Sequence, residues 1–211
     1  MKNKVIVSRD AGKELKNHLS EKADLMIFEP INTVAEPVRC HPDLVYCRLK
    51  EDIIFMGNER LLKPVYPGDI IYNGFSTGKY FIHDLEHTDR SLLKSAKDLN
   101  LTLVNVKQGY ACCSIVPVDE DSIITYDRGI AKAAEAAGIN VLTVDPGHVE
   151  LPGYDTGFIG GTSGRVGDEI IFNGDLSAHP DCQAIRQFIE ERGLKVRYFS
   201  GYPLRDIGSI I

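Results

Sequence analysis

Two adjacent cysteines near the middle of the chain are the first residues whose type suggests chemistry. Cys112 and Cys113 stand in the segment Gly109-Tyr-Ala-Cys-Cys-Ser-Ile115. A cysteine thiolate is a nucleophile, and a nearby cation favours the thiolate by lowering the pKa of the thiol. The segment has strand composition, and successive side chains of a strand point to opposite faces. We therefore expect only one of the two thiols to face a site; the alternative is that both are small buried core residues.

A histidine later in the chain has the context of a general acid or base. His148 lies in Pro146-Gly-His-Val-Glu150, after a strand predicted over residues 139–144. Loops that connect strands often carry catalytic groups, and an imidazole exchanges a proton near neutral pH. We expect His148 to be catalytic, and the alternative is a solvated or capping loop histidine.

Acidic residues recur where predicted structural units begin. Asp43, Asp155 and Asp206 all have this position, and His41 precedes Asp43 in the tripeptide His-Pro-Asp. If the carboxylates converge, they can bind a cationic group through charge-assisted hydrogen bonds. We expect these four residues to bind substrate, and the alternative for each aspartate is a solvated loop carboxylate.

We expect neither a metal nor a cofactor. Cys40, His41, Asp43 and Cys47 are close in sequence, but they include no Cys-x-x-Cys pair and no second cluster follows them. The glycine-dense segment 153–164 contains no lysine and precedes a strand, so it is not a phosphate-binding Walker A loop.

The composition excludes several classes of protein. The 211 residues include 30 acidic and 24 basic side chains, a net charge of −6, which argues against nucleic-acid binding. Apolar runs are far shorter than the roughly 20 residues of a membrane span, and the first residues do not form a signal peptide. The 5 cysteines are an odd number, which argues against a disulfide scaffold. We expect a cytoplasmic protein that binds neither nucleic acid nor membrane; a homo-oligomer remains open.

The elements that must position these residues form a weak internal repeat. The order strand, strand, helix, strand is predicted three times, with starts at residues 69, 111 and 157. The predicted helices cover residues 88–99, 128–137 and 180–192. A shorter unit, over residues 43–56, has little room for a helix of its own.

The two ends of the chain complete a fifth unit. The sequence predicts a strand, a helix and a strand over residues 5–28, with no preceding strand, and a lone strand over residues 206–211. Pairing of the last strand with the first unit would close the array and remove exposed sheet edges. We predict an α+β fold, a single domain over residues 1–211 built as a five-unit β/α propeller. A doubly wound α/β fold is the alternative.

Five such units around a pseudo-fivefold axis resemble the pentein, or guanidino-group-modifying, superfamily. The resemblance covers nearly the whole chain and is mainly topological. It implies a hydrolase or transferase that acts on guanidino or amidine C–N bonds through a cysteine, with a small cationic substrate. Because the superfamily also includes the ribosomal anti-association factor, the alternative is a non-catalytic binding protein.

Two segments carry the resemblance at the level of residues. The Cys112-Cys113-Ser114 segment is similar to the Thr-Cys-Cys-Ser segment of some dimethylarginine dimethylaminohydrolases, in which the first cysteine is the nucleophile. Gly147-His148-Val149 resembles the Gly-Leu-His-Leu context of their catalytic histidine. The resemblance therefore implies Cys112 as nucleophile and His148 as general acid or base. In those enzymes the cysteine lies in the last strand, whereas Cys112 lies in mid-chain.

Overall fold

The computed structural model describes residues 3–211 as a mixed α+β protein with five small sheets and five short α-helices. The strands are β1 (Lys4–Ser8), β2 (Asp24–Phe28), β3 (Tyr46–Lys50), β4 (Ile53–Met56), β5 (Phe75–Ser76), β6 (Tyr80–His83), β7 (Thr102–Asn105), β8 (Ile115–Asp119), β9 (Ser122–Thr125), β10 (Asn140–Thr143), β11 (Ser163–Val166), β12 (Glu169–Phe172) and β13 (Lys195–Arg197). The helices are α1 (Lys13–Lys22), α2 (Arg90–Asp98), α3 (Ala111–Ser114), α4 (Arg128–Ala136) and α5 (Cys182–Glu190).

Three of the sheets share one topology. In each, an antiparallel hairpin is followed by a helix and then by a third strand, parallel to the second, which gives the orders β5-β6-β7, β8-β9-β10 and β11-β12-β13. The order predicted from residue 69 onward is therefore present. β3 and β4 form a hairpin without a third strand, and only a short 3-10 turn, Glu59–Leu61, follows them.

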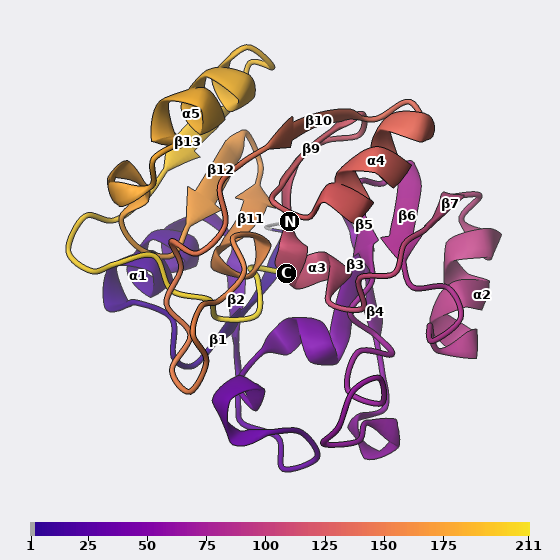
Figure 1. Ribbon diagram of the computed structural model, residues 1–211. Coiled ribbons are helices and arrows are strands. Elements are labelled where there is room, and N and C mark those ends of the chain that lie inside the picture. Colours follow the sequence, from indigo (N-terminus) through magenta and orange to yellow (C-terminus); the bar gives the residue numbers. More distant parts are fainter. Residues whose placement is uncertain (1–2) are drawn as a thin grey trace.

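The C-terminal residues lie beside the first strand. Ile6 and Ile211 exchange two backbone hydrogen bonds, of 2.6 and 3.0 Å, the arrangement of an antiparallel pair. Ile207, Ile210 and Ile211 are all buried, and the first two pack with Val5. Figure 1 shows the C-terminus near the centre of the molecule, with α1, α2, α4 and α5 on its periphery.

The cysteine segment is helical, so the strand predicted to begin at residue 111 begins at Ile115 instead. The side chain of Asn73 explains the difference. Its Oδ1 accepts the backbone N–H groups of Cys112 and Cys113, at 3.0 and 3.4 Å, and its backbone carbonyl oxygen also accepts the Cys112 N–H, at 3.1 Å. Asn73 thus satisfies N–H groups that have no partner within a first helical turn. The expectation that Cys112 and Cys113 point to opposite faces of a strand therefore does not apply.

Two further strands are also shorter than expected. β5 is limited to Phe75–Ser76 because residues 68–74 turn, and a 3-10 turn, Gly160–Thr162, replaces the first part of the strand expected from residue 157. Each hairpin is thus entered from a turn that brings polar residues toward the centre of the molecule. No helix within residues 3–211 combines the length and the apolar character needed to cross a membrane.

A buried histidine supports the loop that leads to α3. The His83 ring at the end of β6 is fully buried; its Nε2 donates to the carbonyl oxygen of Gly109 at 2.9 Å, and Nδ1 lies 2.8 Å from Thr88 Oγ1. Burial lowers the pKa of His83 from 6.5 to about 4. The imidazole is therefore neutral in the folded protein at pH 7.

This low pKa predicts a loss of stability in acid. The unfolded chain takes up a proton on His83 as the pH falls below 6.5, whereas the folded protein does so only near pH 4. The contribution of neutral His83 to the free energy of unfolding is thus complete above pH 6.5. It is lost between pH 6.5 and 4, and the loss is at most about 3 kcal/mol. Urea unfolding at several pH values measures it. The His83→Gln variant keeps a hydrogen-bond donor but has no imidazole to protonate, so we expect its stability to fall less than that of the wild type between pH 6.5 and 4. An identical pH dependence of stability in the two proteins would refute this role of His83.

Candidate functional site

Buried polar and thiol side chains from three distant parts of the chain meet at the centre of the molecule. They come from the turn before β3, from α3, and from the C-terminal segment, and each belongs to a buried residue. We call them the central cluster: His41, Asp43, Cys112, Cys113, Asp206 and Ser209.

Asp43 joins the three parts of the central cluster. Its Oδ2 accepts hydrogen bonds from Cys113 Sγ at 2.8 Å and from Ser209 Oγ at 2.9 Å. Ser209 Oγ in turn lies 3.6 Å from Cys112 Sγ, which donates to it. The second oxygen, Oδ1, is buried and has no hydrogen-bond partner among the described residues. A buried carboxylate with one free oxygen is costly unless something else compensates it.

Asp206 and His41 form the other side of the central cluster. Asp206 Oδ1 lies 3.8 Å from His41 Nδ1 and accepts the N–H of Gly208 at 3.0 Å, while Oδ2 accepts the N–H of Phe158 at 2.9 Å. Two backbone donors thus hold this carboxylate in place. His41 packs so closely against Gly208 that a Cβ added to Gly208 would lie 2.3 Å from the His41 Cβ.

Burial makes the ionised thiols unfavourable. The pKa of Cys112 and of Cys113 is raised well above its usual value, first by burial and then by the negative charge of Asp43. Burial also raises the pKa of Asp43, and the nearby His41 opposes this shift. The cluster therefore holds acidic groups for which an added positive charge is the natural complement.

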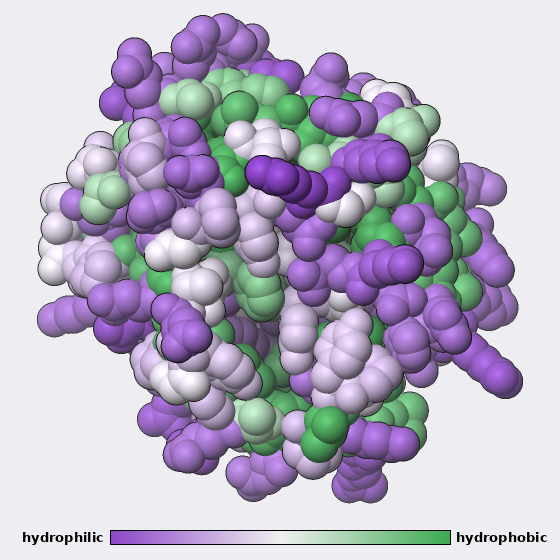
Figure 2. Space-filling view, viewed as in Figure 1, coloured by the Kyte–Doolittle hydropathy of each residue, from purple (hydrophilic) through white to green (hydrophobic). Residues whose placement is uncertain are grey.

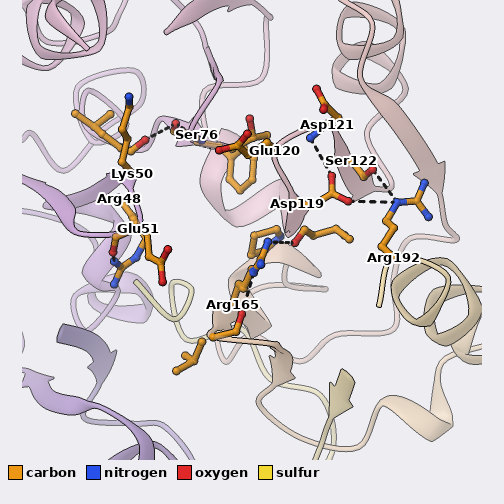
Figure 3. A pocket seen from close by; sticks show the side chains of 18 of the residues that line it. Arg48, Lys50, Glu51, Ser76, Asp119, Glu120, Asp121, Ser122, Arg165 and Arg192 are labelled. Atoms are coloured by element: carbon orange, nitrogen blue, oxygen red, sulfur yellow. Dashed lines mark hydrogen bonds and ion pairs between the residues drawn. The ribbon is translucent and has the colours of Figure 1, made fainter. Parts of the chain in front are cut away.

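Cys112 and Ser209 line a small recess of about 60 Å³. The recess shares Arg48, Phe75 and Arg165 with a larger cleft of about 1060 Å³, so the cleft is the route toward Cys112. Turns of the hairpins surround this cleft, which Figure 3 shows with Arg165 at its centre. At this volume the recess has room for a small chemical group.

Charged side chains of both signs line the cleft (Figure 3). Six are acidic and four are basic, which makes the lining net negative. Arg192 lies near Asp119, with 3.7 Å between Nε and Oδ2, and donates to Ser122 Oγ at 2.7 Å. Arg48 and Arg165 donate to backbone carbonyl oxygens, including that of Val118. Arg48 and Arg165 line both the cleft and the recess, whereas Arg192 lines the cleft.

An aromatic stack adjoins the central cluster. The ring centroid of Phe158 lies 5.8 Å from that of Tyr110 and 5.9 Å from that of Tyr126. Because Tyr110 precedes α3 and the Phe158 N–H bonds to Asp206, the stack connects the two sides of the cluster. Figure 2 shows side chains of intermediate hydropathy over the centre of the face where Figure 1 places α3 and the C-terminus.

The structure brings together four of the six residues singled out in the sequence. Cys112, His41, Asp43 and Asp206 belong to the central cluster, whereas His148 and Asp155 are exposed on loops. The His148 ring packs against the ring of His179, with 5.1 Å between centroids.

Two members of the site have no obvious sequence signal. Asn73 orients α3 through its Oδ1, and its Nδ2 lies 3.4 Å from Cys113 Sγ. Ser209 has a backbone φ of 68°, which is uncommon for a residue other than glycine. The position of Asn73 shortly before β5, like that of Asp43 shortly before β3, was the available signal.

The glycine next to Asp206 allows a direct test of this packing. A Cβ added to Gly161 would lie 2.0 Å from Asp206 Oδ1, and the two N–H donors leave that carboxylate little freedom. We expect Gly161→Ala to destabilise the protein by about 1–3 kcal/mol, measured by urea unfolding. Gly201→Ala is the control, because its Cβ would meet only Glu14, at ordinary distances from 3.4 Å. Equal stability of the two variants would contradict this placement of Asp206.

No curated protein and no solved structure matches the chain significantly. Residues 53–211 match the model of a family of unknown function, DUF6873. This region contains Cys112, Cys113, Asp206 and Ser209, while His41 and Asp43 precede it. Because the match covers most of the chain, the protein belongs to the DUF6873 family.

Proposed function

We propose that the protein is a hydrolase that acts on a guanidino or amidine C–N bond, with Cys112 as the nucleophile. One observation carries this proposal: the Cys112 thiol lines a recess and is linked through Ser209 to the buried carboxylate of Asp43. A thiol, a carboxylate and an imidazole together can carry out nucleophilic substitution at an electron-poor carbon.

The arrangement of the sheets supports a pentein-like, five-unit array. Three sheets repeat the hairpin, helix and parallel strand, the β3–β4 hairpin would be a fourth unit, and β1–β2 with Ile211 would be the fifth. β3 contacts β5, and β8 contacts β11, as neighbouring inner strands of such an array would. In such an array the central cluster would lie at the axis.

The charge of the site favours a cationic substrate. Asp43 and Asp206 are both buried beside the His41 imidazole, and Asp43 Oδ1 lacks a partner among the described residues. A guanidinium or amidinium group supplies both positive charge and N–H donors for such carboxylates. Its positive charge beside Cys112 also favours the thiolate.

The reaction would proceed in two displacements. The Cys112 thiol proton passes through Ser209 toward Asp43, and the thiolate attacks the cationic carbon to form a C–S bond. The C–N bond then breaks, and the leaving amine takes up a proton. Water subsequently attacks the same carbon, the C–S bond breaks, and a ureido or amide product leaves with the thiol restored.

The imidazole that assists would be His41 rather than His148. His41 belongs to the central cluster, whereas His148 is exposed and its ring packs against His179. His41 would take a proton from the attacking water or give one to the leaving amine. Asp206 would orient the ring from 3.8 Å.

The arginines that line both the cleft and the recess favour a substrate with a carboxylate. Arg48 and Arg165 line both cavities, and each guanidinium can bind a carboxylate while the cationic end of the molecule reaches Cys112. The proposed substrate class is therefore guanidino acids, with arginine and methylarginines as the first candidates.

A substrate panel tests the proposal. The protein is incubated with arginine, methylarginines, a short guanidino acid and agmatine, and released ammonia or amine and the ureido product are measured together. We expect turnover of at least one guanidino acid and slower turnover of agmatine, which lacks the carboxylate. If no compound yields product, the proposal is overturned; tight binding without turnover would instead favour a non-catalytic binding protein.

A further inference from the structure

We propose that His41, Asp43 and Cys113 form a binding site for a zinc-like divalent cation. One ligand atom from each residue lies within 4.8 Å of the other two, and all three residues are buried. Ligand atoms around tetrahedral zinc are about 3.3–3.8 Å apart, from bond lengths of about 2.0–2.3 Å. Shifts of about 1 Å would therefore bring the three atoms onto one ion. Thiolate, imidazole and carboxylate are all common zinc ligands.

The free oxygen of Asp43 is the second observation that points to a cation. Oδ1 is buried without a hydrogen-bond partner among residues 3–211, while Oδ2 already accepts from Cys113 and Ser209. An ion bound to Oδ1 would satisfy that oxygen and balance the buried charge. The Cys113 proton, which now lies between Sγ and Asp43 Oδ2, would be released when the thiolate binds the metal.

Neighbouring groups would support these ligands. Asp206 lies beside the His41 ring, and a carboxylate in that position commonly orients a metal-binding histidine. Asn73 Nδ2 lies 3.4 Å from Cys113 Sγ and would donate to the thiolate. Gly208 fits tightly against His41 and limits its movement. Cys113 is 70 positions from Asp43, so the short-range spacing of Cys40, His41, Asp43 and Cys47 could not reveal this set.

The ion would act as a switch on the proposed activity. The ion would occupy His41 and Asp43, which the proposed reaction needs for proton transfer and for binding the substrate cation. Binding of the ion does not need Cys112. Metal binding and catalysis therefore depend on different thiols. A failure of the proposed metal site can be distinguished from a failure of the proposed enzymatic activity, because metal binding is measured without any substrate.

A competition titration tests the site. Metal-free full-length protein is mixed with a chromophoric zinc chelator, and Zn²⁺ is added. We expect one equivalent of Zn²⁺ per chain, with affinity lowered at least about 100-fold in Cys113→Ser and Asp43→Asn. Cys112→Ser is the matched control, since it changes the adjacent thiol and is expected to bind like the wild type. No binding by wild type, or equal binding by Cys113→Ser, would overturn the proposal.

A spectroscopic measurement makes the result independent of variant folding. Co²⁺ added to wild-type protein is expected to give tetrahedral visible bands and a near-ultraviolet thiolate-to-metal charge-transfer band. Cys112→Ser should retain that band. A spectrum of octahedral Co²⁺ without charge transfer in wild-type protein would exclude Cys113 as a ligand, whatever the stability of Cys113→Ser.

Discussion

A chain that ends at Asp206 is expected not to fold. Deleting residues 207–211 removes three buried isoleucines, Ile207, Ile210 and Ile211, together with their contacts to the first strand. Loss of a buried isoleucine side chain costs about 2–5 kcal/mol, so the sum approaches or exceeds the roughly 5–15 kcal/mol that stabilise a typical domain. The backbone of β1 also loses its partner at Ile6.

Soluble expression, near-ultraviolet circular dichroism and thermal unfolding check this expectation. Ile207→Ala in the full-length chain is the matched control, because it removes one buried side chain and leaves the pairing of Ile6 with Ile211 in place. We expect the control to fold with a stability about 2–5 kcal/mol lower. A truncated chain that unfolds cooperatively, with stability close to that of the full-length protein, would show that the C-terminal segment does not hold β1.

Cys112→Ser is expected to abolish turnover of the guanidino acid that the panel identifies. A serine hydroxyl is a far weaker nucleophile than a thiolate at neutral pH, so kcat should fall by at least about 10³-fold, or about 4 kcal/mol in activation free energy. Stability should change little, because serine is nearly isosteric and can still donate to Ser209 Oγ.

Cys113→Ser is the matched control for this loss. The Cys113 thiol donates to Asp43, a role that a serine hydroxyl can also fill, so we expect kcat to change by no more than about 10-fold. Initial rates at saturating substrate, with unfolding curves for both variants, measure the contrast. An inactive Cys113→Ser beside an active Cys112→Ser would reverse the assignment of the nucleophile.

Much of the fold follows from local sequence patterns. The helices observed as α2, α4 and α5 fall within the predicted ranges, and Asp89 and Asp127 cap the first two as expected for residues at a helix start. Counting repeated units predicts a strand over residues 206–211 that pairs with the first unit; the structure pairs Ile211 with Ile6, but residues 206–211 form no regular strand. The helix predictions succeed because caps and glycine stops are encoded within a few residues of each element.

The site was less predictable because it depends on long-range contacts. Residues 111–114 have strand-like composition, yet they form a helical turn whose Cys112 and Cys113 N–H groups bond to Asn73, which is distant in sequence. Cys113 gains its carboxylate partner from Asp43 in the same way. His148 resembles a catalytic histidine in its local sequence, yet it is exposed beside His179. Local patterns locate polar residues near unit boundaries, but the tertiary structure decides which of them meet.

Affinity labelling tests most directly the claim that Cys112 faces a cation-binding recess. Native protein is treated with a cationic haloacetamidine or with its neutral haloacetamide analogue, and the modified cysteines are mapped by peptide mass spectrometry. Cys182, the most exposed of the five cysteines, is the internal reference. We predict that the cationic reagent modifies Cys112 at least about 10-fold faster than the neutral one, relative to Cys182, because the nearby carboxylates attract it. An unmodified Cys112, or equal rates with both reagents, would contradict the proposed site.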